Sequence, residues 1–325
     1  MSMDRLSAGK YLVIGRVGMD MTPTPQNTRT REAETMFVSM GGSSANIAAG
    51  LVRMGCDASL VTCVSDDSIG WYCLDQLDAY GVSKNHVRKV TGECRTSLAI
   101  YETRIEEHQS VIYRNNAADF QMDASDIEAI DFSAYSAVIT TGTVFAAEPS
   151  RSAAFLAFEK ARAAGLPIIF DVDYRPYSWP SPQVAEEVLS RAGGMADVIV
   201  GNDEEFGFMA GDIAKGQDMA RRLASTSAAI VVYKMGPEGA VTFADGDEMH
   251  TGVYPASAIK PTGAGDSFMA GMMSSLTQGR PLQEAVLRGS ACAAIVVSNV
   301  GCAVAMPTPA ALDEFLNTHP APLRG

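Results

Sequence analysis

The fold class is decided between residues 137 and 200, where the sequence reads Ala137-Val-Ile-Thr-Thr141, then Pro167-Ile-Ile-Phe-Asp171, then Asp197-Val-Ile-Val200. Short apolar runs of this kind are typical of strands that are buried on both faces. The segments between them, residues 150–165 and 182–193, have helical periodicity and end in glycines that suit helix C-caps. Strand and helix alternate, so we expect an α/β fold with a mainly parallel sheet flanked by helices.

The same pattern continues toward both ends of the chain. Three further apolar runs read Tyr11-Leu-Val-Ile-Gly15, Ala58-Ser-Leu-Val-Thr-Cys-Val64 and Ala228-Ala-Ile-Val-Val-Tyr233. In sheets of this class, ligands bind beyond the carboxyl ends of the strands. The site should therefore be sought in the loops that follow these runs.

Two segments have an extended, alternating character that does not fit the main sheet. They cover residues 34–40 and 95–114, and the second contains the polar turn Glu106-Glu107-His108 between two expected strands. The stretch Thr22-Pro-Thr-Pro25 predicts a local turn. Since no repeat or Pro-rich linker interrupts the sequence, we expect one domain over residues 1–325, with a small β lid formed by residues 16–40 and 94–118.

Composition excludes several classes of protein. Of the 325 residues, 47% are hydrophobic and 19% charged, which is enough for a large core and unlike a disordered chain. The net charge of -13 argues against nucleic acid or anionic lipid as a partner, because both require clustered Lys and Arg. Six cysteines without a CxxC pair suggest reduced thiols. Without a charge-free apolar run of ~18 residues, we expect no membrane span and a cytoplasmic location.

The chemistry-bearing segment is the loop Thr262-Gly-Ala-Gly-Asp266, which precedes a helix with Phe268, Met272 and Leu276 on one face. Glycines at a helix start expose backbone amides, and the helix dipole there favours an anion such as a phosphoryl group in transfer. Asp266 in the first turn can take a proton from an attacking hydroxyl, a contribution of roughly 10²–10⁴-fold in rate. Taken alone, the loop could also be a Gly-rich turn capped by Asp266.

Other catalytic motifs are missing from the sequence. There is no GxxxxGK[ST], and GxGxxG fails because Phe268 stands where the last glycine is required. HExxH and GxSxG are also absent. P-loop, dinucleotide-binding, metalloprotease and serine hydrolase interpretations therefore lack their chemistry.

Together with Gly41-Gly-Ser-Ser-Ala-Asn-Ile-Ala-Ala-Gly50, this loop resembles the two signatures of the ribokinase-like (PfkB) carbohydrate kinase family. Asn202-Asp-Glu-Glu205 resembles the family's NxxE element, and Lys234-Met-Gly-Pro-Glu-Gly239 its glycine turn beside the nucleotide. The resemblance implies a ribokinase-like fold and transfer of the ATP γ-phosphoryl group to a primary hydroxyl, with Mg²⁺ as a cofactor.

The resemblance also implies roles for individual residues. Asp266 would be the catalytic base, and Gly263, Ala264 and Gly265 would form the anion hole. Substrate hydroxyls would be bound by Asp20, Gly41, Gly42 and Asn46. The nucleotide would be bordered by Asn202, Glu205, Lys234, Gly236, Gly239, Thr262 and Asn299, with Asn202 and Glu205 also holding Mg²⁺ through water.

Each of these motifs has a structural alternative. Asn46 could be a helix-start cap and Glu205 a solvated helix residue, while Gly236 to Gly239 could be a plain hairpin turn.

The flank of the catalytic loop departs from the family pattern. Relatives with a monovalent-cation site commonly read DTxGAGD, whereas Lys260 and Pro261 stand here in place of Asp and Thr. We therefore expect no potassium dependence, and hypothesise that the Lys260 ammonium occupies the region of the missing cation. The alternative is a surface lysine before a proline-fixed turn.

Two stretches resemble sugar-acid kinases within the family: Ile112-Tyr-Arg-Asn-Asn-Ala-Ala-Asp119 and Phe170-Asp-Val-Asp-Tyr-Arg-Pro-Tyr-Ser-Trp179. This implies 5-dehydro-2-deoxygluconate of inositol catabolism as the small-molecule acceptor. Tyr113 and Arg114 would meet it, with Arg114 on its carboxylate, because a guanidinium offers two parallel hydrogen bonds. Arg175 would contact substrate or the transferring phosphate. Alternatively, both arginines form exposed salt bridges with nearby acids such as Asp119 and Asp173.

Other functions stay open at this point. Rival acceptors are 2-dehydro-3-deoxygluconate and fructose. A sugar- or nucleotide-sensing protein that lost catalysis is the alternative from a different class, and the intact GAGD argues against it. The resemblance also implies that lid strands can form a homodimer interface.

Overall fold

The computed structural model describes residues 3–104, 107, 109–260 and 262–323. Its main sheet has nine strands in the order β13-β12-β11-β10-β9-β8-β1-β4-β5. The strands from β11 to β5 in this order run parallel, and β12 and β13 add an antiparallel edge. Their bounds are β1 (Lys10–Ile14), β4 (Asp57–Ser65), β5 (Ser83–Val90), β8 (Ala137–Thr141), β9 (Ile168–Asp171), β10 (Val198–Asn202), β11 (Ile230–Lys234), β12 (Ala240–Ala244) and β13 (Asp247–Thr251).

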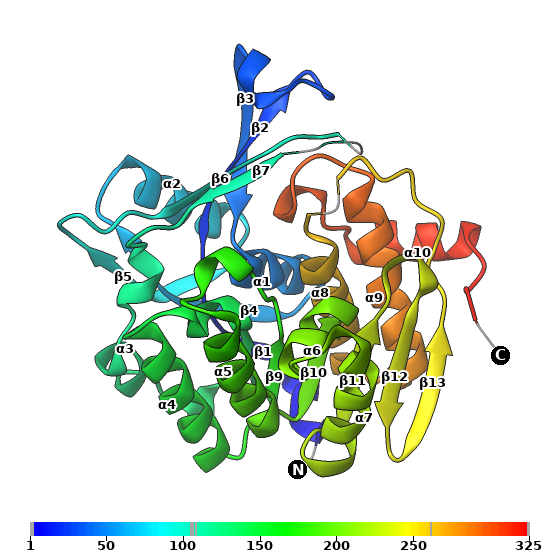
Figure 1. Cartoon of the computed structure of the whole chain (residues 1–325). Coiled ribbons are helices and arrows are strands. Elements are labelled where there is room, and N and C mark those ends of the chain that lie inside the picture. Colours follow the sequence, from blue (N-terminus) through cyan, green and yellow to red (C-terminus); the bar gives the residue numbers. More distant parts are fainter. Residues whose placement is uncertain (1–2, 105–106, 108, 261, 324–325) are drawn as a thin grey trace.

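Helices cover both faces of this sheet (Figure 1), because successive side chains of each strand point to opposite sides. On β1, Leu12 and Ile14 pack into one core, while Tyr11 and Val13 pack into the other. The first core includes α3 (Ala124–Glu128), α4 (Ser150–Ala163), α5 (Pro182–Met195), α6 (Asp203–Met209) and α7 (Gly216–Thr226). The second includes α1 (Ser43–Arg53), α2 (Ser68–Ala79), α8 (Ala264–Thr277) and α9 (Leu282–Val297), against which α10 (Pro309–Thr318) packs. The predicted α/β fold is confirmed.

A second sheet lies across the carboxyl ends of the main strands (Figure 1). Its order is β3-β2-β6-β7, with β2 (Gly18–Thr24), β3 (Thr35–Gly41), β6 (Ser97–Tyr101) and β7 (Ser110–Tyr113). These strands fall within the two segments expected to form a lid, except that β3 extends one residue further, to Gly41. Closure of this sheet over a ligand stays a prediction, as does the single-domain organisation.

The expected turn at residues 22–25 is wrong for most of its length. Thr22 and Thr24 belong to β2 and pair with β3, and the chain turns only after Thr24, where Thr28 donates its N–H to the Pro25 carbonyl. A proline at the strand position between them is tolerated when its missing N–H is not needed by a neighbouring strand. Of the predicted turn around Glu106, residues 106 and 108 lie outside the described part of the chain.

Three strands of the main sheet were not predicted from the sequence: β5, β12 and β13. Polar side chains fill β5 and β13, which read SKNHVRKV and DEMHT, so neither shows an apolar run. The six cysteines are unpaired, and all but Cys94 are buried, as expected. In the described part of the chain, no helix combines the length and apolar character that crossing a membrane requires.

Candidate active site

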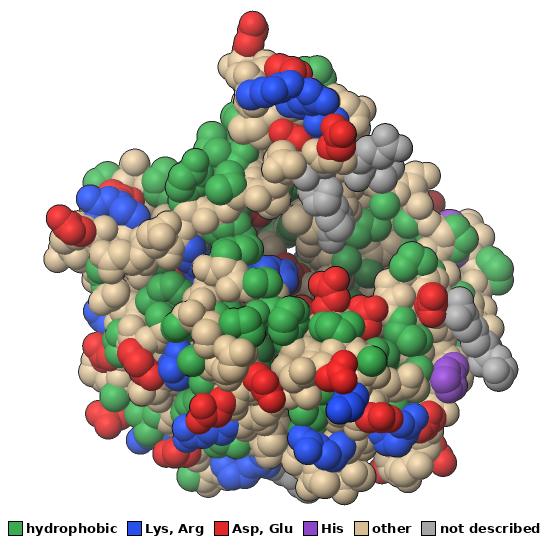
Figure 2. Space-filling model, in the orientation of Figure 1, with side chains coloured by type: hydrophobic (Ala, Val, Ile, Leu, Met, Phe, Trp, Pro, Cys, Tyr) green, Lys and Arg blue, Asp and Glu red, His purple; other side chains and the backbone are tan. Residues whose placement is uncertain are grey.

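Most of the predicted site residues gather where the parallel strands end, beneath the small sheet, and Asn299 is the exception described below. The carboxyl ends of β1, β8, β9, β10 and β11 face the first turns of α1 and α8, which come from distant parts of the sequence. Figure 2 shows a hollow on this face of the molecule, below the small sheet, with acidic and basic side chains around it. This is the location at which α/β sheets bind ligands.

The start of α8 is built to receive an anion. Its N-cap Gly263 has a φ of 85°, and a Cβ at this position would lie 2.6 Å from Cys302 Sγ, so only glycine fits. Among the described residues, no protein acceptor is found for the N–H groups of Ala264, Gly265 and Asp266. These three amides stand at the positive end of a 14-residue helix, where a phosphoryl group in transfer would be stabilised.

Asp266 is held by a residue 220 positions away. Asn46 Nδ2 donates to Asp266 Oδ2 at 2.8 Å. Asn46 lies inside α1 and Gly42 is the N-cap, so the helix-cap alternative for Asn46 is wrong. Burial, assisted by the charge of Asp173 and opposed by the Asn46 hydrogen bond, raises the pKa of Asp266 to about 6. At neutral pH the carboxylate is still mostly ionised and can accept a proton.

Asp20 lies against the glycine pair that precedes α1. A Cβ on Gly41 would lie 1.9 Å from Asp20 Oδ1, and one on Gly42 would lie 2.5 Å from the Arg16 carbonyl oxygen. Burial raises the pKa of Asp20 to about 6, opposed by the charges of Arg16 and Lys260. The structure therefore brings these predicted substrate residues together with Asn46.

Arg114 is almost completely buried and only partly satisfied. Its Nη2 donates to Asp119 Oδ2 at 2.5 Å and to the Thr143 carbonyl at 3.1 Å, and the guanidinium lies 4.1 Å from the centre of the Phe120 ring. Its Nε and Nη1 are buried without a partner. The salt bridge to Asp119 that we considered as an alternative is present, but it is buried rather than exposed and leaves two donors unused. The adjacent Tyr113 is 59% exposed on β7.

Arg175 pairs with Asp173 at 2.8 Å and reaches Glu205 at 3.8 Å. The second oxygen of Asp173 accepts from Ser43 Oγ at 2.7 Å and from Thr143 Oγ1 at 3.2 Å. These bonds fix Asp173 and direct the half-exposed Arg175 side chain over the carboxylates at the carboxyl edge of the sheet.

Asn202 and Glu205 form a reciprocal cap at the start of α6. Asn202 Oδ1 accepts from the Glu205 N–H at 2.8 Å, and Glu205 Oε2 accepts from the Asn202 N–H at 2.7 Å. Glu205 is buried, so the solvated-residue alternative is wrong. Burial raises its pKa, opposed by the charges of Lys234 and Arg175.

This pair fits Mg²⁺ only as a contributor. Within the described residues, no group of three or more His, Cys, Asp or Glu side chains could enclose a metal ion. A buried carboxylate beside an amide suits an ion that keeps several waters and takes other ligands from substrate phosphates, which is the usual state of Mg²⁺.

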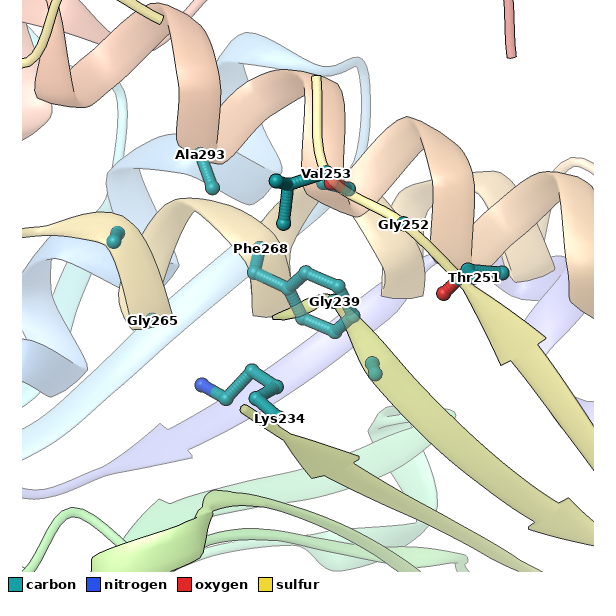
Figure 3. A pocket seen from close by; sticks show the side chains of 11 residues that line it. Lys234, Gly239, Thr251, Gly252, Val253, Gly265, Phe268 and Ala293 are labelled. Carbon is teal, nitrogen blue, oxygen red and sulfur yellow. The ribbon is translucent and has the colours of Figure 1, made fainter. Parts of the chain in front are cut away.

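A hollow of about 110 Å³ lies between the end of β11 and the start of α8. In Figure 3, Lys234 points from the end of β11 toward Gly265 and Phe268. A methyl group placed on Gly265 would lie 3.4 Å from Lys234 Nζ. The turn Gly236–Glu238 and Gly239 connects the antiparallel strands β11 and β12, so the hairpin-turn alternative is correct. The same turn also borders the hollow.

A larger groove of about 640 Å³ continues from this hollow. The residues that line both include Val253 and Ala264, and much of the remaining groove is lined by apolar side chains, among them Tyr254 and Val297. Apolar walls beside an anion site suit a nucleotide base next to its phosphates. None of these four residues except Ala264 was selected from sequence, because apolar residues carry no distinctive motif.

Thr262 and Asn299, both predicted to border the nucleotide, lie in different surroundings. Thr262 Oγ1 is buried without a hydrogen-bond partner, which leaves it available to a ligand. Asn299 is exposed, donates to the Ile295 carbonyl at 2.8 Å and lines a separate hollow with Arg53 and Thr308. The structure thus places Asn299 outside the lining of the groove.

Lys260 is 2% exposed, so the surface-lysine alternative is wrong. Its Nζ donates to the Thr262 carbonyl at 2.6 Å and lies 3.8 Å from Cys302 Sγ. No Asp or Glu within the described ranges lies at ion-pair distance from it. A buried ammonium therefore stands beside the loop of the anion hole. The neighbouring Pro261 lies outside the described residues.

Two buried charged residues were not selected from the sequence. Arg16 follows β1, and Asp171 ends β9, so both occupy the carboxyl edge where ligands bind. Burial raises the pKa of Asp171 well above its usual range, opposed mainly by the charge of Lys234. Their position at the carboxyl end of a buried strand was the available signal.

Comparison with known proteins agrees with this geometry. Residues 8–309 match the family model described as pfkB family carbohydrate kinase. The chain is 33% identical over 313 residues to 5-dehydro-2-deoxygluconokinase of Photobacterium profundum, covering 95% of each chain. It is also 33% identical over 314 residues to the protein of that name from Geobacillus kaustophilus, covering 95% of this chain and 94% of the relative. The structure superposes on fructokinase from Vibrio cholerae O395, solved with fructose, ADP and calcium, with a TM-score of 0.83 at 24% identity, over 95% of this chain and 99% of that one.

Proposed function

The chain belongs to the pfkB family of carbohydrate kinases and uses ATP, and from this premise we propose that it phosphorylates a primary hydroxyl of the sugar acid 5-dehydro-2-deoxygluconate. One observation carries the proposal of phosphoryl transfer: Asp266 is held by Asn46 in the first turn of α8, where three backbone amides have no protein acceptor in the described part of the chain. A base and an anion hole thus share one helix turn.

The transfer proceeds in line. Asp266 accepts the proton of the acceptor hydroxyl, whose oxygen forms a bond to the γ-phosphorus while the bond to the bridging oxygen of ADP breaks. The amides of Ala264, Gly265 and Asp266 receive the charge that develops on the phosphoryl oxygens. Lys234, from the opposite wall of the hollow, adds a positive charge to the same region.

Asn202 and Glu205 hold Mg²⁺ through water in this proposal. When bound, the ion neutralises phosphate charge and orients the phosphate chain. Gly236, Gly239 and Thr262 border the phosphates, and the apolar groove of about 640 Å³ takes the base. The small sheet closes over the acceptor and excludes water, which is itself a competent phosphoryl acceptor.

The sugar acid is favoured over an uncharged sugar by Arg114. A buried guanidinium with two unpartnered nitrogens is costly unless a ligand completes its hydrogen bonds, and a carboxylate does so with matching geometry. The two relatives compared above carry the name of a kinase for this acid. The roles of Tyr113, Arg175 and Asn299, homodimer formation through the lid and a cytoplasmic location stay predictions.

The test is a coupled assay of ADP release with 5-dehydro-2-deoxygluconate, 2-dehydro-3-deoxygluconate, fructose and ribose. We expect the first acid to give the highest kcat/KM and ATP hydrolysis to stay slow without an acceptor. Preference for 2-dehydro-3-deoxygluconate or fructose would replace the proposed substrate. ATP binding without any turnover would indicate a sensing protein instead.

Arg114→Met examines the carboxylate contact separately. We expect its KM for the acid to rise about 10-fold or more, because a hydrogen bond to a charged group contributes about 1.5–3 kcal/mol. An unchanged KM would remove the main physical support for a sugar acid.

A further inference from the structure

Arg16 is a buried arginine that the sequence did not predict as a site residue. It follows β1 directly after Gly15, and its side chain is 9% exposed. Its carbonyl accepts from the Ala45 N–H at 3.2 Å, which fixes its backbone beside Asn46, the residue that holds Asp266. Arg16 therefore lies at the same carboxyl edge of the sheet as the catalytic residues.

The guanidinium of Arg16 is poorly satisfied by the protein. Its one side-chain hydrogen bond within the described residues runs from Nη1 to Ser97 Oγ at 3.5 Å, the outer limit for such a bond. Its Nε is buried without any partner. No carboxylate in the described ranges lies within 4.0 Å of its nitrogens, unlike those of Arg114 and Arg175.

Burying a guanidinium with so few hydrogen bonds destabilises the protein unless a ligand or another group supplies the missing acceptors. Desolvating a charge costs several kcal/mol, and proteins normally offset this with a paired, hydrogen-bonded partner. Arg114 shows the same deficit on two nitrogens. The two arginines are linked through β6, because Arg16 Nη1 reaches Ser97 and the next residue, Leu98, pairs with Tyr113, which directly precedes Arg114. Two neighbouring guanidinium groups thus present unused donors while Asp119 pairs with only one of them.

The charges around Arg16 restrict what can fill this place. Asp20 and Asp266 both lie within range of its positive charge, yet neither forms an ion pair with it. Asp266 is committed to Asn46 and to the acceptor hydroxyl, and Arg16 lines neither the hollow beside Lys234 nor the groove proposed for the nucleotide base. A planar anion carried by the acceptor matches the unused donors, because carboxylate oxygens take parallel hydrogen bonds from a guanidinium fork.

We propose that Arg16, together with Arg114, binds the carboxylate of the acceptor, so that Arg16 is a specificity-determining residue of this kinase. The inference rests on the proposed function, since it requires an acidic acceptor. It adds a second guanidinium, from the segment after β1, to the contact made by Arg114 directly after β7, so the carboxylate would join the main sheet to the small sheet.

The experiment compares wild type with Arg16→Met, Arg16→Lys and the control Ser97→Ala, using the acid that the wild type phosphorylates best. Arg16→Met should raise the KM for that acid about 10- to 100-fold, the loss expected for a charged hydrogen-bonding group. The kcat and the KM for ATP should stay within about threefold of wild type. Arg16→Lys keeps the charge but not the fork, so its KM should fall between the two.

Ser97→Ala removes the one hydrogen-bond partner of Arg16 in the described chain without touching its charge, and should leave the KM for the acid within about threefold. Thermal unfolding of each variant reports whether the fold is intact. A KM increase in Ser97→Ala equal to that in Arg16→Met would mean that Arg16 only links the sheets, and would overturn the inference. A fall in kcat at unchanged KM would place Arg16 on the transferring phosphate and would overturn it too.

Failure of the proposed function has a different signature. If the wild type phosphorylates fructose or ribose but no acid, the proposed substrate class and this inference fall together. If the wild type phosphorylates an acid and Arg16→Met keeps its KM for that acid, only the inference about Arg16 falls. Should Arg16→Met not fold, Arg16→Lys decides by the same KM comparison.

Discussion

Replacing Asp266 with Asn is the sharpest test of the catalytic geometry. An Asn has nearly the same shape, and its side-chain oxygen can still accept from Asn46 Nδ2, which lies 2.8 Å from the carboxylate in the wild type. The first turn of α8 should therefore survive, with its three amides that have no acceptor among the described residues. What is lost is the ability to accept a proton, which contributes about 10²–10⁴-fold in rate. We expect kcat to fall by that factor while the affinity for ATP stays nearly unchanged.

The pH profile gives this prediction a second, independent readout. Because burial raises the pKa of Asp266 to about 6, the carboxylate is about 99% ionised at pH 8 and about 9% ionised at pH 5. A base works only when ionised, so wild-type activity should fall about tenfold as the pH drops from 8 to 5. Residual activity in Asp266→Asn should lack this acid limb.

Asp20 complicates the interpretation, since burial raises its pKa to about 6 as well. The assay therefore measures kcat at saturating acceptor and KM separately, in wild type, Asp266→Asn and Asp20→Asn. Asp20→Asn should raise KM and keep the acid limb in kcat. Near-normal kcat in Asp266→Asn, or an acid limb that persists in it and disappears in Asp20→Asn, would refute the assignment of Asp266 as the base.

Three further predictions concern the surroundings of the base. Wild-type activity should change less than about twofold when tetramethylammonium replaces potassium, because the buried Lys260 supplies the positive charge. The variant Lys260→Met should lower kcat about tenfold or more. A strong rise of wild-type activity with potassium would contradict this assignment. Glu205→Gln should raise the Mg²⁺ concentration for half-maximal activity about 10-fold. The control Glu204→Gln changes an exposed neighbour and should leave this concentration unchanged. Equal effects when Mg²⁺ is titrated into both variants would count against a metal role for Glu205. Gly263→Ala should lower the free energy of unfolding by more than Gly279→Ala does. Both glycines have positive φ, but only at Gly263 would an added Cβ meet a close neighbour. Denaturant titration measures the difference, and equal losses of about 1 kcal/mol would mean that the close approach is unimportant.

Much of the fold could be predicted because its signals are local. Apolar runs such as Ala137-Val-Ile-Thr-Thr141 coincide with strands that are buried on both faces. The predicted helix at 150–165 corresponds to α4, which ends at Ala163. The edge strands β5 and β13 gave no signal, because most of their side chains are polar and at least partly exposed, so they carry no apolar pattern. Pro23 led to the opposite error: it favoured a turn, but the structure accommodates it inside the strand β2.

The sequence by itself determined the chemistry that depends on neighbours in the chain: the glycine-rich start of α8, the carboxylate in its first turn and the reciprocal cap of Asn202 and Glu205. Only the tertiary structure decided which charges are buried and which are paired, because that depends on groups brought together from distant strands. Arg114 appeared as a carboxylate ligand or a surface ion pair, and packing made it a buried pair with two donors left over. Arg16 carried no motif at all, and its unsatisfied guanidinium becomes visible only when β1, α1 and β6 meet around it.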